Sequence, residues 1–265
     1  MSRSATKLAV IEGARPVIEA LRAARRKIHE VWLPEGDGSP ARRELEALLA
    51  STGIVIRASR ADEGVRALAD PFPEEEFEAL LRGESPRFLV ALDRVTDVGN
   101  LGSIARTAEA CGATGLILEY RQAPPIAAGA LRTSAGALEH LRVGRTPNLV
   151  RALDLAYVEG ATILVAEAGA PAIDQLPVDL LRGDLVWVFG SEDRGARPGV
   201  QRRADARVGI PLAGRTASLG VSAAAAYLLL RTAEIRRPGE KSTNPHASFR
   251  AHQGPKMPGG TDEIS

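Results

Sequence analysis

Short apolar runs alternate with helical segments after residue 87, and this alternation restricts the fold more than any other feature. Residues 88–92 form a continuous apolar run that ends at Asp93. A polar loop follows, then a segment with helical spacing over residues 101–111 and a second apolar run at 116–118. A strand, a loop, a helix and a strand in this order predict a βαβ unit and therefore a parallel sheet.

The same order continues to residue 236. We expect further strands at residues 162–166, 185–189 and 208–211, and helices at 148–157 and 222–235. Four or five buried strands that alternate with helices predict an α/β fold with a doubly wound sheet over residues 88–236.

The N-terminal residues 1–82 predict a separate, smaller α/β unit. The pattern indicates helices at residues 13–26 and 42–50 and strands at 28–33 and 54–56. Residues 61–84 are acidic and weakly patterned, which is typical of an exposed helix and a linker, and we place the linker at residues 83–87. Residues 237–265 are rich in Pro, Gly, Ser and charge and predict a disordered tail.

The composition is typical of a soluble cytoplasmic protein. Hydrophobic residues make up 45% and charged residues 25% of the chain, which are ordinary values for a globular protein. No apolar run is long enough to span a bilayer, so no membrane partner is expected. The single cysteine, Cys111, excludes an internal disulfide framework and a multi-cysteine zinc site, and we expect no metal.

A basic cluster lies in the N-terminal unit, although the net charge of the whole chain is only +1. It comprises Arg15, Arg22, Arg25, Arg26, Lys27 and His29. Such a cluster can bind phosphate, as in a nucleic-acid-binding protein, or it can be a solvated helix face. The sequence leaves both interpretations open.

Three polar loops follow expected strands, at the edge of the sheet where parallel α/β proteins bind ligands. The first contains Asn100 and, six residues later, Arg106. An asparagine at the start of a helix is ordinarily an N-cap, and this is the preferred interpretation of Asn100 taken alone. Arg106 stands in an otherwise small and apolar stretch, so it is either paired with an acid or directed at a phosphate.

The second loop places Glu192 between Gly190 and Gly195, and the third runs from Ile210 to a Ser-Leu-Gly-Val-Ser segment that opens an Ala-rich helix. Glycines allow close backbone approach, and Glu192 can hold a hydroxyl or amino group. Neither a P-loop nor a G-x-G-x-x-G fingerprint is present, which disfavours a nucleotide-dependent oxidoreductase. Each loop alone is also explained by an ordinary turn or helix cap.

In this order and spacing, the three loops resemble the motifs of the SpoU/TrmH family of SPOUT RNA 2'-O-ribose methyltransferases. The family's first motif, Asn with Arg six residues on, matches Asn100 and Arg106. Its second, apolar-Gly-x-Glu-x-x-Gly, matches residues 189–195, and its third, Ile-Pro followed by Ser-Leu-Asn-Val-Ser/Ala, matches Ile210, Pro211 and residues 218–222. Residues 134–153 are similar to the bacterial branch that methylates a guanosine of 23S rRNA. The N-terminal unit resembles, more weakly, the L30e-like substrate-binding domain of that branch.

The resemblance implies a sheet with a C-terminal trefoil knot and S-adenosylmethionine as the cofactor. The residues that it implies for the cofactor pocket are Gly190, Glu192, Gly195, Ile210, Leu212, Ser218 and Leu219. It implies RNA as the partner, 23S rRNA above all, and a homodimer in which the arginine of the first motif completes the site across the interface. We therefore expect Arg106 to activate the ribose 2'-hydroxyl, either as a base of lowered pKa or through the adjacent RNA phosphate. Asn100 and Glu192 are expected to position Arg106 and the substrate, and Ser218 to hydrogen bond within the site.

The chain departs from the family pattern at Gly220, where the third motif ordinarily has asparagine. Two alternatives therefore stay open beside methylation of 23S rRNA. The same chemistry can act on another rRNA nucleotide, including a resistance-type methylation, or on a tRNA. The chain can also be an RNA-binding homologue with weakened catalysis.

Overall fold

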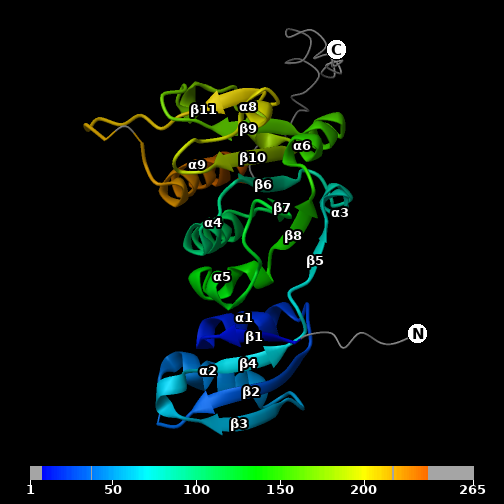
Figure 1. The fold of residues 1–265 in the computed structure, drawn as a ribbon, viewed down its shortest axis with the longest axis vertical. Helices are drawn as coiled ribbons and strands as arrows, with labels where there is room; N and C mark the ends of the chain where they lie inside the picture. The colour runs from blue at the N-terminus through cyan, green and yellow to red at the C-terminus, as the bar shows by residue number, and fades with distance from the viewer. Residues whose placement is uncertain (1–7, 37, 217, 238–265) are drawn as a thin grey trace.

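The computed structural model describes residues 8–36, 38–216 and 218–237, which form two units stacked along the long axis of the molecule (Figure 1). The expected tail, residues 238–265, lies outside the described residues. The N-terminal unit has four strands in the order β1-β4-β2-β3, and only β2 and β3 run parallel. Its elements are β1 (Ala9–Glu12), α1 (Ala14–Ala23), β2 (Ile28–Pro34), α2 (Pro40–Leu49), β3 (Val55–Ser59), a short 3-10 helix (Ala61–Glu63) and β4 (Arg66–Ala69).

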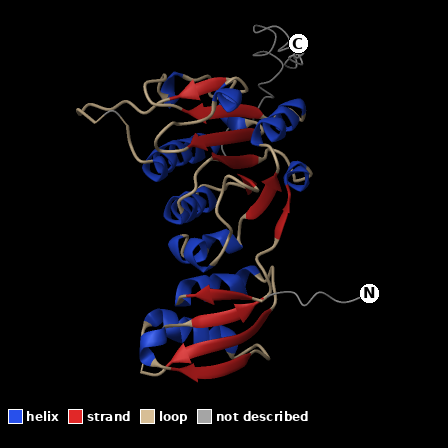
Figure 2. Cartoon of the chain, viewed as in Figure 1, coloured by secondary structure: helices blue, strands red, loops and turns tan. Residues whose placement is uncertain are grey.

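The larger unit is built on seven strands in the order β11-β9-β10-β6-β7-β8-β5, and every neighbouring pair is parallel (Figure 2). The strands are β5 (Glu74–Glu76), β6 (Phe88–Asp93), β7 (Gly115–Glu119), β8 (Arg142–Thr146), β9 (Thr162–Ala166), β10 (Leu185–Gly190) and β11 (Ala206–Val208). The central strands β6, β7 and β10 are buried along their whole length, which is why their sequences are continuous apolar runs rather than alternating ones.

Helices cover both faces of the larger sheet. Alternate residues of β6 belong to two separate cores, with Val90 in one and Leu89 in the other. The first core includes residues of α4 (Val98–Ala110), α5 (Ala128–Thr133), α7 (Asp179–Arg182) and α9 (Val221–Arg236). The second includes residues of α3 (Phe77–Leu81), α6 (Leu149–Val158) and α8 (Pro198–Gln201). Two short 3-10 helices, Ala137–Glu139 and Ile173–Gln175, complete the unit. The α/β fold with a parallel sheet is confirmed, whereas the trefoil knot stays a prediction.

The structure contains more strands than the sequence predicted, and the boundary between the two units lies earlier in the chain. Strand β5 pairs with β8, and Phe77 and Leu80 of α3 are buried in the second core of the large sheet. Residues 74–81 are therefore part of the larger unit, so the boundary expected at residue 82 is too late. Strand β8 has the sequence RVGRT, and its two arginines, Arg142 and Arg145, interrupt the apolar run that a buried strand would otherwise show. Those arginines pair with β5, since Arg142 and Arg145 form ion pairs with Glu75 and Glu74.

Most of the basic cluster in the N-terminal unit forms contacts within the protein. The side chains of Arg26 and Glu139 form an ion pair between the two units and are only 2% and 1% exposed. Arg25 donates to the backbone carbonyl oxygens of Glu139 and Leu141. The remaining pairs lie nearer the surface and are Arg15–Glu44, Arg22–Glu19, Arg22–Glu44 and His29–Asp70. Arg25 and Arg26 therefore serve contacts between the two units, whereas the exposed pairs of Arg15 and Arg22 leave both interpretations of the cluster open.

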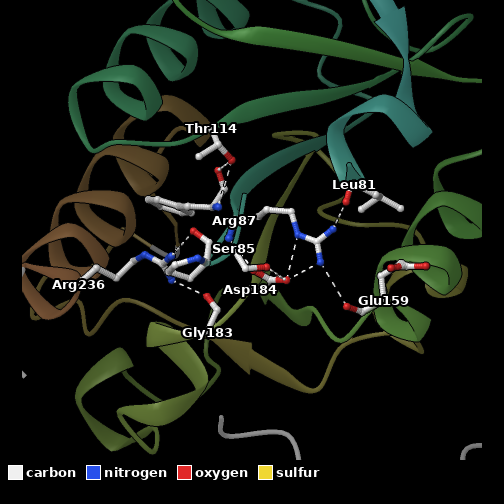
Figure 3. Close-up of polar contacts among 10 residues, drawn as sticks. Leu81, Ser85, Arg87, Thr114, Glu159, Gly183, Asp184 and Arg236 are labelled. Atoms are coloured by element: carbon white, nitrogen blue, oxygen red, sulfur yellow. Dashed lines mark hydrogen bonds and ion pairs between the residues drawn. The ribbon is translucent and has the colours of Figure 1, made fainter. Parts of the chain in front are cut away.

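The C-terminal end of α9 is held at the amino edge of the sheet by a second polar cluster (Figure 3). Arg236 donates to the carbonyl oxygens of Gly183, at 2.7 Å, and Leu181, at 2.6 Å. Beside it, Asp184 accepts from the backbone N–H of Arg87 at 2.6 Å and from its Nε at 2.9 Å. Burial raises the pKa of Asp184, but the hydrogen bonds from Arg87 and Ser85 outweigh this effect and hold the pKa below its ordinary value.

The depressed pKa of Asp184 predicts a contribution to stability that is lost in acid. A carboxyl group whose pKa is lowered in the folded state stabilises the fold above its unfolded pKa of about 3.9 and loses this effect as the pH falls through the folded pKa. We expect Asp184→Asn to lower the free energy of unfolding by about 1 to 3 kcal/mol at neutral pH. Urea unfolding across a pH series should show this difference shrinking below about pH 4. A difference that stays constant down to about pH 2 would contradict the assignment.

Candidate functional site

A cleft of about 410 Å³ opens at the carboxyl edge of the larger sheet, on the side of β9, β10 and β11. Four segments line it: the loop after β9, the loop after β10, the segment after β11, and the start of α9. Every residue that the sequence assigned to a cofactor pocket lines this one cleft: Gly190, Glu192, Gly195, Ile210, Leu212, Ser218 and Leu219. The sequence missed the loop after β9, where Glu167, Ala168 and Gly169 also line the cleft. No motif distinguished that loop, and only its position after a parallel strand gave a signal.

Glycines shape the walls of the cleft by allowing backbone segments to meet. A Cβ atom on Gly190 would lie 2.1 Å from the backbone of both Gly195 and Ala196, so the loop after β10 folds back directly onto Gly190. The turn is closed by the N–H of Gly195, which donates to the carbonyl of Ser191 at 2.8 Å, and Gly195 has a φ of +64°. Only glycine adopts such a backbone without strain, so both glycines have a steric explanation.

Glu192 links the three motif loops. Its Oε1 atom accepts hydrogen bonds from Nδ2 of Asn100, at 3.2 Å, and from the backbone N–H of Val221, at 3.3 Å. Val221 is the first residue of α9, so a carboxylate from the second motif satisfies a free N–H group at the start of the third-motif helix.

Asn100 is not the N-cap of α4, which corrects the preferred interpretation of this residue taken alone. The N-cap is Asp97, whose Oδ1 accepts from the backbone N–H of Asn100 at 2.7 Å. The side chain of Asn100 is thereby left to donate to Glu192. The helix begins three residues earlier than the apolar pattern indicated.

Gly220 occupies the N-cap position of α9 with an ordinary φ of −56°. A Cβ at this position would lie 3.3 Å from Oε1 of Glu192. The backbone therefore accepts a side chain here without strain, but the carboxylate of Glu192 would have to move by a few tenths of an ångström. The absence of a side chain at residue 220 allows Glu192 to approach the start of α9 closely.

Beneath the second-motif loop lies an ion network that the sequence did not reveal. Arg197, two residues after Gly195, donates from Nε to Oδ1 of Asp93 at 2.6 Å and from a terminal nitrogen to Oε2 of Glu119 at 2.8 Å. Asp93 also accepts from the backbone N–H of Arg197 at 2.7 Å and is fully buried. The only signal in the sequence was an acidic residue at the end of two otherwise apolar strands, β6 and β7.

Arg197→Met is expected to loosen the wall of the cleft by leaving Asp93 and Glu119 without a cation. We expect a loss of about 2 kcal/mol in the free energy of unfolding, less than for a fully buried pair because 21% of the Arg197 side chain is exposed. The KM for the ligand of this cleft should rise more than kcat falls, because the network supports the loop and not the reacting atoms. Arg203→Met is the matched control, since Arg203 pairs with an exposed carboxylate of Asp154 and its loss should cost under about 1 kcal/mol. Equal effects of the two substitutions would contradict this role for Arg197.

Arg106 lies on the exposed surface of α4 and does not line the cleft. Asn100 and Arg106 are six residues apart, so they point about 120° apart around the helix and about 9 Å apart along it. A single chain thus brings Asn100 and Glu192 together, with Ser218 on the wall of the cleft, but it does not bring Arg106 to them.

Within the described residues, no group of three or more His, Cys, Asp or Glu side chains is arranged to hold a metal ion. None of the described helices combines the length and hydrophobicity that a membrane crossing requires.

Comparison with known proteins identifies the family. The sequence profile of the SpoU rRNA methylase family matches residues 87–230, and that of RNA 2'-O ribose methyltransferase substrate binding matches residues 10–62. The chain is 31% identical to a 23S rRNA (guanosine-2'-O-)-methyltransferase of Pseudomonas syringae pv. tomato, over 87% of this chain and 97% of that protein.

Two solved structures are similar over most of their length. The AdoMet-bound rRNA methyltransferase from Sinorhizobium meliloti has a TM-score of 0.69 and 25% identity, covering 88% of this chain and 89% of that one. The SpoU methyltransferase AviRb from Streptomyces viridochromogenes, in complex with the cofactor AdoMet, has a TM-score of 0.71 at 22% identity, covering 88% and 92%, and so supports the fold alone. The chain belongs to the SpoU rRNA methylase family of S-adenosylmethionine-dependent RNA 2'-O-methyltransferases.

Proposed function

We propose that this protein methylates the ribose 2'-hydroxyl of a guanosine in 23S rRNA. The observation that carries the proposal is the junction at Glu192, which joins all three motif loops around a single cleft. The relative from Pseudomonas syringae, which carries this activity in its name, is matched over 97% of its length. The two units of this chain therefore align with nearly the whole length of that protein.

The residues of the cleft fit S-adenosylmethionine. Leu212, Leu219 and Leu228 supply apolar surface for a base, and the backbone of the loop after β10 supplies polar groups. A cleft of about 410 Å³ is within the usual range for small-molecule sites. When bound, the cofactor supplies an electrophilic methyl group.

We assign the remaining chemistry to side chains at the mouth of this cleft. Glu192 holds Asn100 in place, and Asn100 in turn orients the substrate ribose. Ser218 forms a hydrogen bond within the site. Arg106 of a second protomer in a homodimer contacts the phosphate next to the reacting nucleotide and polarises its 2'-hydroxyl. A neutral guanidine is not required for this role, since the charged arginine stabilises the developing alkoxide while the RNA phosphate that it contacts accepts the hydroxyl proton.

The test of the proposal is to locate the methylated nucleotide. Primer extension on rRNA and tRNA from cells that lack or express the protein should show one 2'-O-methyl stop, at a guanosine of 23S rRNA, that depends on the protein. A dependent stop elsewhere in rRNA or in a tRNA would replace the proposed target by the alternative one. The absence of any dependent stop would refute the proposed function.

Gly220 favours a second candidate, an RNA-binding homologue with weakened catalysis. The family's asparagine is missing at this position, and with it one polar group beside Glu192. Titration calorimetry with S-adenosylmethionine separates the two candidates. Binding followed by methyl transfer to rRNA supports the enzyme, whereas the lack of binding at millimolar cofactor supports the homologue.

A further inference from the structure

Three adjacent loops at the carboxyl edge of the larger sheet each present one exposed arginine. Arg194 follows β10, Arg94 follows β6 and Arg121 follows β7. The strands are neighbours in the order β10-β6-β7, and their registers pair Gly190 with Asp93 and Leu92 with Leu118. The three strands therefore end at the same level, the three arginines lie in the loops that follow, and Arg194 also lines the cleft.

None of these three guanidinium groups forms an ion pair within the described residues. Many other arginines on both units pair with carboxylates, as in Arg57–Glu30 and Arg203–Asp154. Arg94 in addition has a φ of +61°, a left-handed conformation that costs energy for any residue other than glycine. Such conformations tend to be kept where a side chain has a function outside the fold.

An exposed tyrosine completes this surface. Tyr120 directly follows β7, and half of its surface is exposed. Its hydroxyl donates to Oε1 of Glu76, at the end of β5, at 2.6 Å. This hydrogen bond raises the pKa of Tyr120, so the hydroxyl remains a donor at neutral pH. Strand β8 lies between β7 and β5. The side chain of Tyr120 therefore spans the end of β8, because its backbone follows β7 and its hydroxyl is bonded to Glu76 of β5.

The aromatic side chains elsewhere in the described residues are buried or only partly exposed. Tyr120 is therefore the ring best placed to meet a partner. Three carboxylates near this edge already have cations, because Glu74 pairs with Arg145, Glu75 with Arg142 and Glu119 with Arg197. These ion pairs reduce the negative charge that the three arginines face.

We propose that Arg194, Arg94, Arg121 and Tyr120 form a binding strip for a single-stranded segment of the substrate RNA. The three arginines contact phosphates, and the ring of Tyr120 stacks on one base. The inference rests on the proposed function, and it adds that a nucleotide near the methylated one is unstacked. Neighbouring strands lie about 4.8 Å apart, so the loop of β7 is about 10 Å from that of β10. This separation places the stacked base next to the nucleotide at the cleft and not within it.

The chemistry of the strip favours a single strand over a duplex. In A-form RNA the bases are stacked inside the helix and their faces are inaccessible, whereas loops and bulges expose bases that stack on aromatic side chains. Surfaces that bind single strands commonly combine basic side chains for the phosphates with aromatic rings on which bases stack. The three arginines and Tyr120 provide the same combination.

The test compares affinity for a labelled single-stranded oligoribonucleotide in the full-length protein. Tyr120→Ala should weaken binding roughly 5- to 100-fold, whereas Tyr120→Phe, which keeps the ring, should retain most of the affinity. Arg94→Gln and Arg121→Gln should each weaken binding and lower the slope of log affinity against log salt by about 0.7. A duplex of the same sequence should bind less tightly than the single strand and respond little to Tyr120→Ala.

Two matched controls use exposed residues away from this edge. Val158→Ala removes an exposed apolar side chain near the end of α6, and Arg82→Gln removes an exposed arginine just after α3. Both should bind RNA as the wild type does. The strip is refuted if Tyr120→Ala binds RNA as tightly as Val158→Ala, or if duplex and single strand respond alike. The absence of methyl transfer by the wild type would refute the proposed function instead, since the binding measurements need no cofactor.

Discussion

Replacing Arg106 with alanine is expected to reduce methyl transfer by roughly 10²- to 10⁴-fold while leaving the affinity for S-adenosylmethionine nearly intact. The physical reason is the position of Arg106 on the exposed face of α4, away from the cleft of its own protomer. It does not line that cleft, so its loss should not change cofactor binding, whereas in the proposed homodimer it contacts a substrate phosphate at the site of the partner. Single-turnover methyl transfer and titration calorimetry measure the two effects separately. A loss of cofactor affinity would mean that the role of Arg106 is misassigned.

Mixing two inactive variants tests whether Arg106 acts across an interface. If it does, a mixed dimer of Arg106→Ala and Glu192→Ala protomers contains one site with both changes and one site with neither. Random pairing of subunits should then restore about a quarter of the wild-type activity. If Arg106 acts within its own protomer, every site in the mixture carries one change and no activity returns. The same mixture therefore also tests the proposed homodimer.

Arg26→Met is expected to have the largest effect on stability, about 3 to 5 kcal/mol in the free energy of unfolding. The substitution leaves the carboxylate of Glu139 buried between the two units without its cation. Chemical denaturation followed by circular dichroism measures the loss. Arg57→Met removes a surface ion pair with Glu30 and should cost under about 1 kcal/mol.

The double variant Arg26→Met/Glu139→Leu distinguishes loss of the ion pair from loss of packing. Two apolar side chains of similar size can fill the buried space that the two charged side chains occupied. Much of the lost free energy of unfolding should therefore be recovered. A double variant as unstable as Arg26→Met would show that the packing of Arg26 against Phe72, 5.6 Å from the guanidinium to the ring centre, matters more than its charge.

The sequence predicted those strands whose apolar pattern follows directly from burial on both faces of the sheet. Strands β6, β9 and β10 are continuous apolar runs and were found within one or two residues. Strand β5 consists of three glutamates, and β8 contains two arginines, so neither has the pattern of a strand. They become strands because their opposite charges pair across the sheet, and such pairing between distant segments is not visible in either segment alone.

The sequence indicated the residues expected to bind the cofactor, which line the cleft, but not the loop after β9 or the contacts that join the three motif loops. The motifs identified the residues that line the cleft because glycines and a carboxylate recur in fixed order after buried strands. The hydrogen bond from Asn100 to Glu192 was not foreseen, because a cap and a site residue look the same in sequence. The basic cluster around Arg26 was equally ambiguous, since its acidic partner Glu139 lies more than a hundred residues away.

The pairing of β5 with β8 determines where this chain can be divided. A catalytic fragment that begins at residue 83 would lose β5 and α3, exposing the backbone of β8 as a new sheet edge and uncovering the core around Phe77 and Leu80. Open edges of this kind promote aggregation. A chimaera that exchanges the N-terminal unit with that of a relative should therefore be joined between residues 70 and 73. It should also carry a residue opposite Glu139 that can match its charge.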